Sequence, residues 1–185
     1  LVGSEMCIRD SDITVQGGEL STSTCIGQWV SNADVTDMYT KNCFSVGDIT
    51  VNVTNAPEGS YIGAAYGHAA TDGFTMDNFY YAGTVSVTYE SGNPTVGYIS
   101  GTIDGPSPSL TNVYYDKELY AASQCNGNPI PLEGGQYNDI YLSRFVPLST
   151  AQMQANRYEA DDSFRSLDAN PAVLEPSWDY LNGAD

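Results

Sequence analysis

The stretch GTVSVTYESGNPTVGYISGTIDG, residues 83–105, carries the clearest structural signal in the chain. Val85, Val87 and Tyr89 alternate with polar residues, which is typical of a strand that has one buried face. The turn residues ESGNP follow, and a second strand-like run begins at Thr95. Two such runs around a short turn predict a β-hairpin.

The second of these runs loses its alternation beside Gly97 and Gly101. Glycine within a strand marks a bulge or a close approach of another backbone, because it has no side chain. We therefore expect an irregular point in the backbone here.

Alternation with a period of two extends over most of the remaining chain. In VGDITVNVTN, residues 46–55, the side chains of Ile49, Val51 and Val53 share one face of a strand. Clusters of Gly, Pro, Asn and Asp separate the other strand-like runs, which are DITVQ (12–16), CIGQWV (25–30), YIGAAY (61–66), NFYYA (78–82), NVYY (112–115) and DIYLSRF (139–145). Many short strands at this spacing predict an all-β fold, an antiparallel β-sandwich or barrel-like domain. The sequence shows no convincing internal repeat.

Residues 1–11, LVGSEMCIRDS, do not share this pattern. The string resembles, residue for residue, the translation of a sequencing-library adaptor. Such a segment is set aside when a fold is inferred, as a fusion scar would be. We expect it to be an artefact, with the native amino terminus and any signal peptide lying outside this sequence.

The character of the chain changes near Pro147, which divides an all-β domain over 12–147 from a C-terminal part over 148–185. Ser149 and Gln152 have the spacing of a capping box, and a run without Gly or Pro follows them. This pattern predicts one helix, roughly over residues 150–165.

The end of the chain, ANPAVLEPSWDYLNGAD, is punctuated by proline and has no clear stop, so truncation is an open alternative. Three roles fit such an extended tail: docking on this domain, linking it to another, or binding a partner. Leu174, Trp178 and Tyr180 are the apolar residues that would make the contacts.

Charge limits the partners of the protein. The chain has 23 acidic and six basic residues, a formal net charge of −17. Nucleic acid and anionic membrane surfaces are bound by clustered Lys and Arg, so neither is an expected partner. No apolar run approaches the ~18 to 20 residues of a membrane span, so we expect no membrane insertion of this segment.

The cysteines indicate the compartment. Cys25 and Cys43 each begin a strand-like run, and their spacing would allow neighbouring antiparallel strands to bring them together. A disulfide between them implies an oxidising environment, and hence a secreted or cell-surface protein. The alternative is two buried thiols, and Cys125 has no evident partner.

His68 is the only histidine in the sequence. Neither a zinc-ligand set nor a Ser/His/Asp pattern surrounds it. Asp72 is a conceivable partner, but a loop histidine with a structural hydrogen bond is the favoured interpretation.

Paired carboxylates could catalyse glycoside hydrolysis if they are held ~5 to 9.5 Å apart. The candidates are Asp72 with Asp77, and Asp116 with Glu118. A solvated acidic surface explains the same residues more simply, because the chain is so acidic.

Calcium is the better ionic hypothesis, because this cation takes carboxylate, amide and backbone oxygens from loops. SNADVTD and TDGFTMDN are the candidate loops, with the metal ligands Asp34, Asp37, Asp72 and Asp77, helped by Asn32 and Asn78. We expect no cofactor other than such a structural calcium ion.

Tyrosine doublets are the candidate binding residues: Tyr80 with Tyr81, and Tyr114 with Tyr115. Adjacent strand residues point to opposite faces, so one ring of each doublet would be core and the other exposed. An exposed ring suits sugar stacking or protein contact. The alternative is that these rings are half-buried strand filler.

Together these observations favour a secreted or surface-displayed β module with a non-catalytic role in binding, adhesion or surface assembly. Its expected partner is a glycan or a surface protein. The alternative is a small extracellular carbohydrate-active hydrolase that uses a carboxylate pair.

Overall fold

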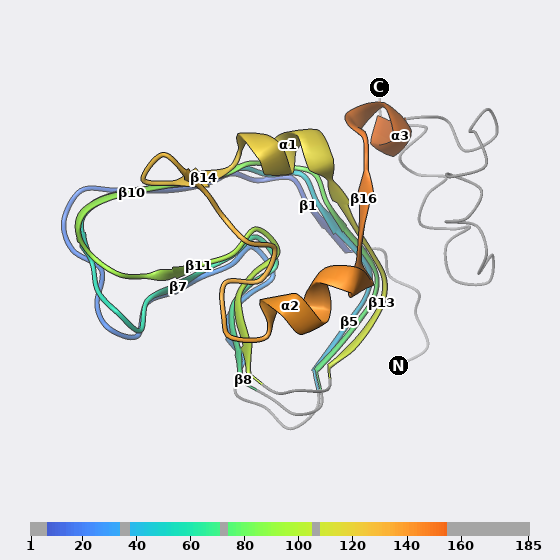
Figure 1. The fold of residues 1–185 in the computed structure, drawn as a ribbon, viewed down its shortest axis with the longest axis horizontal. Helices are drawn as coiled ribbons and strands as arrows, with labels where there is room; N and C mark the ends of the chain where they lie inside the picture. Colours follow the sequence, from blue (N-terminus) through green and yellow to red (C-terminus); the bar gives the residue numbers. More distant parts are fainter. Residues whose placement is uncertain (1–6, 34–37, 71–73, 105–107, 155–185) are drawn as a thin grey trace.

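A computed structural model of the chain describes residues 7–33, 38–70, 74–104 and 108–154 (Figure 1). Its strands are β1 (Cys7–Arg9), β2 (Ile13–Gln16), β3 (Cys25–Ile26), β4 (Val30–Ala33), β5 (Met38–Ser45), β6 (Ile49–Ala56), β7 (Tyr61–Ile62), β8 (Tyr66–Ala70), β9 (Phe74–Tyr81), β10 (Val85–Gly92), β11 (Thr95–Val96), β12 (Ser100–Asp104), β13 (Ser109–Asp116), β14 (Gln124–Cys125), β15 (Asn128–Pro129) and β16 (Phe145–Leu148). The helices are α1 (Lys117–Ala122), α2 (Asn138–Tyr141), the short 3₁₀ turn η1 (Leu142–Arg144) and α3 (Thr150–Gln154).

Most strands pair in parallel with the strand one coil earlier. The sheets have the orders β1-β5-β9-β13-β16, β15-β14-β10-β6-β2, β11-β7-β3 and β12-β8-β4. Ile13 pairs with Ile49 and Cys25 with Tyr61, and hydrogen bonds between coils join residues 36 apart, as in Asp48 with Asp12. The chain therefore winds as a β-solenoid of about three turns. The predicted all-β class is confirmed, but the antiparallel sandwich or barrel is wrong, and so is the absence of a repeat.

The predicted hairpin shows why the topology was misjudged. Its residues form β10, β11 and β12, which belong to three different sheets. In most parallel sheets both faces are buried, which removes the alternation. In a solenoid one face is outside, so parallel strands keep the pattern that usually indicates a hairpin.

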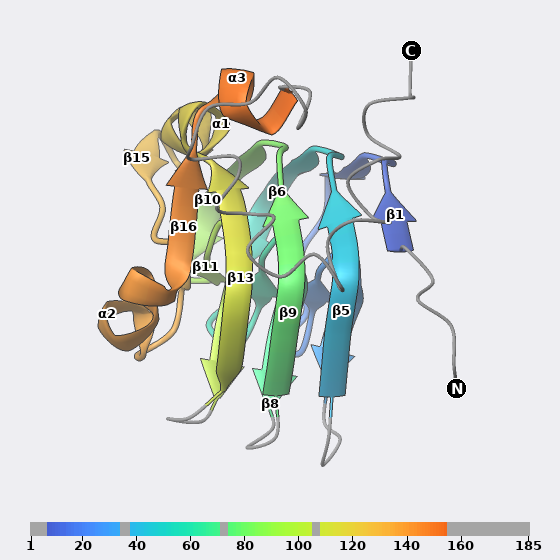
Figure 2. The same cartoon turned by 90° about the vertical axis from the view of Figure 1, so that its right-hand side faces the viewer.

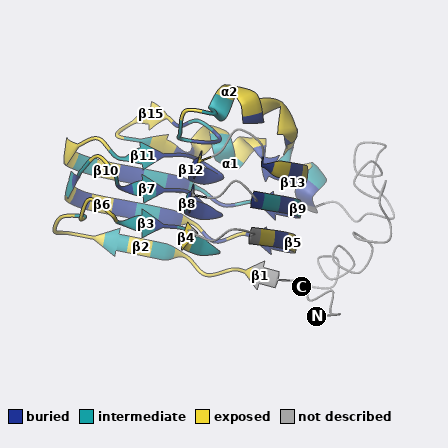
Figure 3. Cartoon of the chain, turned by 90° about the horizontal axis from the view of Figure 1, so that it is seen from below, coloured by how far each residue is buried: buried dark blue, intermediate teal, exposed yellow. Residues whose placement is uncertain are grey.

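The core lies inside the coils. Ile49, Val51 and Val53 point inward and are buried, as the alternation predicted, and Val85 and Val87 stack on the next coil. Figure 3 shows buried residues along the middle strands, whereas β2 at the edge is half-exposed.

Glycines form a sharp corner where β3, β7 and β11 meet β4, β8 and β12. A Cβ at Gly63 would lie 2.3 Å from Gly101 N, and one at Gly97 would lie 1.9 Å from Ser100 O. The close backbone approach predicted beside Gly97 is therefore confirmed. The runs 25–30 and 61–66 are bent at this corner into two short strands each, so neither is a single strand.

Asparagines interrupt the long strands of the opposite sheet. Asn78 and Asn112 have positive φ angles of 52° and 53°, a conformation that asparagine tolerates better than most residues. Asn112 Nδ2 donates to Asn78 Oδ1 at 2.9 Å. Each asparagine shifts the alternation by one residue, so that Tyr81 and Tyr115 point into the core.

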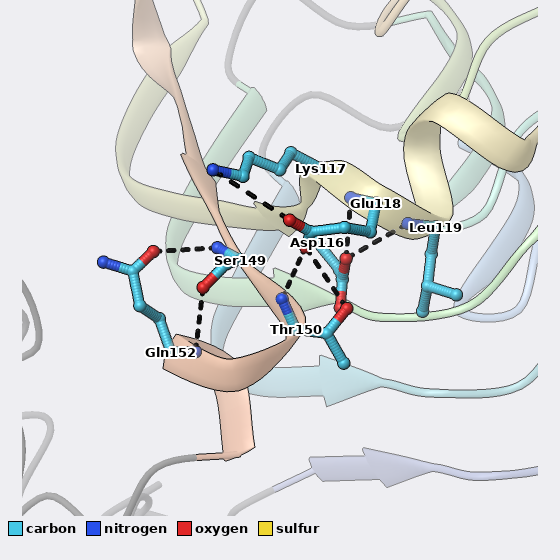
Figure 4. Close-up of polar contacts among 7 residues, drawn as sticks. All are labelled: Asp116, Lys117, Glu118, Leu119, Ser149, Thr150 and Gln152. Carbon is cyan, nitrogen blue, oxygen red and sulfur yellow. Dashed lines mark hydrogen bonds and ion pairs between the residues drawn. The ribbon is translucent and has the colours of Figure 1, made fainter.

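The C-terminal end of the solenoid is covered by short helices. Asp116 Oδ1 accepts hydrogen bonds from Glu118 N at 2.9 Å and Leu119 N at 3.1 Å, which caps α1 (Figure 4). Glu118 in turn accepts from Thr150 N at 2.6 Å. Residues 139–145, predicted as a strand, form mainly α2 and η1, because their pattern does not distinguish a short helix from a strand.

The predicted capping box is present. Gln152 N donates to Ser149 Oγ at 3.1 Å, and Ser149 N donates to Gln152 Oε1 at 2.8 Å. The start of the helix at Thr150 is therefore confirmed, while residues 155–165 of the predicted helix lie outside the described residues.

The first described strand, β1, lies at a sheet edge. Cys7 to Arg9 pair in parallel with Cys43 to Ser45 of β5, and the Arg9 guanidinium lies 5.5 Å from the centre of the Trp29 ring. The adaptor origin of residues 1–11 stays a prediction. Among the described helices, none has the length and apolar character needed to span a bilayer.

Candidate functional site

The glycine corner makes the outer surface of the solenoid concave. In Figure 1 the chain runs along β7 and then bends into β8, so that the outer faces of two sheets are turned toward each other. The rings of Tyr61 on β7 and His68 on β8 stack across this bend, with centroids 4.6 Å apart and planes 12° apart. We name Tyr61, His68, Thr102, Asp104 and Glu133 the corner site.

Asp104, at the end of β12, is the exposed acid of the corner site. Its Oδ2 lies 2.8 Å from His68 Nε2, and its Oδ1 accepts from Thr102 Oγ1 at 3.2 Å. An ionised carboxylate can only accept, so His68 presents an Nε2 proton to it. The Asp104 side chain is 54% exposed and that of His68 18%. The carboxylate is thus fixed in position but open to solvent.

Glu133 is the buried acid, with no exposed surface. Its Oε1 accepts from Ile103 N at 3.0 Å and Gly135 N at 2.8 Å, in place of the strand that would continue the sheet beyond β12. Its Oε2 is buried without a hydrogen bond. Burial raises the pKa of Glu133, and the hydrogen bonds from Ile103 and Gly135 partly oppose this rise.

We expect Glu133→Gln to raise the free energy of unfolding above that of the parent chain at pH 7.5, and to raise it less at pH 5. The pKa of the Glu133 carboxyl is higher in the folded protein than in the unfolded chain, where it is about 4.5. The protonated carboxyl therefore contributes stability at low pH, and this contribution is lost as the pH rises through the pKa of the folded protein. Glutamine keeps the Oε1 acceptor and removes the charge. Urea unfolding of both chains at the two pH values measures the difference.

Glu133→Ala is the comparison variant. It leaves the N–H groups of Ile103 and Gly135 without an acceptor, which costs about 1 to 3 kcal/mol at either pH. If Glu133→Gln were less stable than the parent at pH 7.5, the ionised carboxylate would be the form that the fold requires.

One predicted carboxylate pair has a structural role, and the other lies partly outside the described residues. Asp116 is buried and caps α1, and Glu118 holds the start of α3. The hydrogen bond from Thr150 N lowers the pKa of Glu118. Asp72 lies outside the described residues, so its pairing with Asp77 stays a prediction.

Only one of the four predicted calcium ligands, Asp77, lies within the described residues. Asp77 lies 3.6 Å from Lys41 in an ion pair, whereas Asp34, Asp37 and Asp72 lie outside the described ranges. Over residues 7–33, 38–70, 74–104 and 108–154, no three His, Cys, Asp or Glu residues are grouped to hold a metal ion. Calcium binding stays a prediction.

The tyrosine doublets are not exposed platforms. Tyr80, Tyr81, Tyr114 and Tyr115 are all buried, with exposed fractions of 8% or less. Tyr81 and Tyr115 belong to the core, while Tyr80 and Tyr114 lie on the opposite face of their sheet. The prediction that one ring of each doublet is exposed is therefore wrong.

The predicted disulfide is absent. Cys25 is a free thiol that donates to Ser23 O at 3.7 Å, and Cys125 is also free. Burial raises the pKa of both thiols. Cys43 lies in a different sheet from Cys25, because their separation is half a coil, and its Sγ donates to Lys41 O at 3.1 Å.

Sequence reasoning missed Asp104 and Glu133 and gave His68 the wrong setting. His68 lies in a strand, not a loop, and its partner among the described residues is Asp104. The predicted structural hydrogen bond is confirmed, whereas Asp72 lies outside the described residues. The signal that could have found Asp104 is the register of the coils, since His68 pairs with Thr102 and Asp104 lies two residues further along β12.

The fold and the corner site define a β-solenoid whose concave outer corner carries a fixed carboxylate beside stacked rings. The chain matches no protein-family model, no curated protein and no solved structure.

Proposed function

We propose that this β-solenoid is a non-catalytic binding module of a secreted or cell-surface protein, and that a glycan binds along its corner site. The observation that carries the proposal is the exposed Asp104 carboxylate, held by His68 and Thr102 beside the stacked Tyr61 ring. Carboxylates form strong hydrogen bonds with hydroxyl groups, and aromatic rings cover the apolar faces of sugars.

The shape of the corner favours a linear ligand. Each coil repeats the corner, because Cys25, Tyr61 and Thr95 are in register on one side, and Asn32, His68 and Thr102 on the other. A polysaccharide lying along the solenoid axis could contact several coils at once. Adhesion to a surface that carries the glycan would follow from such binding.

A glycan-array screen followed by calorimetry on the best ligand tests this function. We expect Asp104→Asn to weaken binding about tenfold or more, because a hydrogen bond to a charged group contributes about 1.5 to 3 kcal/mol. Tyr61→Ala should weaken it by about 0.5 to 1.5 kcal/mol. Asp139→Asn and Tyr39→Ala change exposed residues outside the corner site and should bind normally. Full binding by both corner variants would contradict the proposal.

A hydrolase is the second candidate, because Thr102 lies between the Asp104 and Glu133 carboxylates. Thr102 Oγ1 donates to Asp104, and a Cβ on Gly135 would lie 2.3 Å from Thr102 Oγ1 and 2.5 Å from Glu133 Oε1. A buried carboxyl with a raised pKa suits a general acid, although Glu133 has no exposed surface. Hydrolysis of the bound glycan that is lost in Glu133→Gln would favour the hydrolase over the binding module.

A further inference from the structure

A row of aromatic side chains lies on the outer face of β5, β9 and β13. Phe44, Tyr80 and Tyr114 are in register across these strands, and the rings of Phe44 and Tyr80 stack with centroids 4.8 Å apart and planes 3° apart. Their neighbours Cys43 and Phe79 belong to the core. We name Phe44, Tyr80 and Tyr114 the outer aromatic ladder.

The outer aromatic ladder is buried although it is outside the core. Its residues are 6%, 5% and 5% exposed, whereas Tyr39 on β5 is 72% exposed. Burial raises the pKa of Tyr80, and raises that of Tyr114 to about 12. In Figure 2 no described helix or strand lies in front of β5, β9 and β13. Within the described part of the chain, no helix or strand packed on this face accounts for the burial of the three rings.

The chain after β16 begins beside this face. Leu148 and Met153 are buried but, like the ladder, are not part of the core. From α3 the chain continues for 31 residues, 155–185. Strands in a sheet are ~4.8 Å apart and an extended chain covers ~3.3 Å per residue, so this length is ample to cross the sheet.

We propose that residues 155–185 dock across the outer aromatic ladder, with Leu174, Trp178 and Tyr180 as the apolar anchors. This is a second surface, independent of the corner site. It assigns to the C-terminal segment one of the three roles that its composition leaves open.

Trp178 reports on this docking in the full-length chain. The only other tryptophan, Trp29, can be changed to phenylalanine so that Trp178 emits alone. We expect acrylamide to quench Trp178 several-fold less than a free tryptophan derivative. Tyr80→Ala and Tyr114→Ala should restore quenching, whereas Tyr39→Ala on the same strand layer should not.

Trp178→Ala is the control in case substitutions in the outer aromatic ladder unfold the protein. Trp178→Ala changes only the segment, and should shift the pKa of Tyr114 from about 12 toward its ordinary value of 10.0. Trp178 quenched like the free derivative, or a Tyr114 titration unchanged by Trp178→Ala, would overturn the proposal. Protection of Trp178 that appears only as the protein concentration rises would overturn it too, in favour of a second copy of the chain.

Discussion

Replacing Gly63 by alanine should cost about 3 kcal/mol or more of the free energy of unfolding. A Cβ there would lie 2.3 Å from Gly101 N and 2.5 Å from Tyr66 O. Both are backbone atoms at the corner, so no side chain can rotate to make room. Overpacking of a tight site costs about 1 to 3 kcal/mol, and more where the backbone itself has to move.

Gly18→Ala separates crowding from backbone conformation. Gly18 has a φ of +71°, and a Cβ added there would have nothing within 4 Å, so alanine incurs only the left-handed backbone penalty of about 1 to 2 kcal/mol. Urea unfolding followed by circular dichroism measures both variants. Equal losses would show that crowding at the corner is not what Gly63 avoids.

Burial along the strands was predictable, but the direction of pairing was not. Alternation placed Ile49, Val51 and Val53 correctly inside, because it depends only on one strand having a wet face and a dry face. Pairing direction depends on where the next strand lies. The clue was the repeated DITV at residues 12–15 and 48–51, which marks the 36-residue coil. A single four-residue match is too short to stand out as a repeat.

The candidate site was beyond the reach of local patterns. Asp104 meets His68 only because β12 pairs with β8 in a register that places Thr102 beside His68 and Asp104 two residues further along. Glu133 comes from the segment after the third coil, where it forms an isolated bridge with Ser100. The two rings of each tyrosine doublet lie on opposite faces of their sheet, as alternation predicts. The exposure predicted for the outer rings was wrong, because alternation tells on which face a side chain lies and not how far that face is buried.

Tyr98 crosses the narrow part of the solenoid interior. It is fully buried, its ring contacts those of Tyr81 and Tyr120 with centroids 4.8 Å and 5.1 Å away, and its hydroxyl donates to Gly83 O at 2.8 Å. In the preceding coil the equivalent position is Ala64. There the hydrogen bond across the interior comes from Tyr81, whose hydroxyl donates to Gly47 O at 3.0 Å. The large Tyr98 side chain therefore packs between the rings of Tyr81 and Tyr120 inside the solenoid.

We expect Tyr98→Ala to lower the free energy of unfolding by about 3 to 5 kcal/mol, since it removes a buried aromatic ring and leaves a cavity. Tyr98→Phe keeps the ring and loses the hydroxyl, which donates to Gly83 O at 2.8 Å and lies 3.4 Å from Asp116 O; this loss should cost about 1 kcal/mol. Denaturant unfolding of the parent and the two variants gives both numbers. A Tyr98→Phe loss as large as that of Tyr98→Ala would mean that the hydrogen bond across the interior, rather than packing, holds the third coil in place.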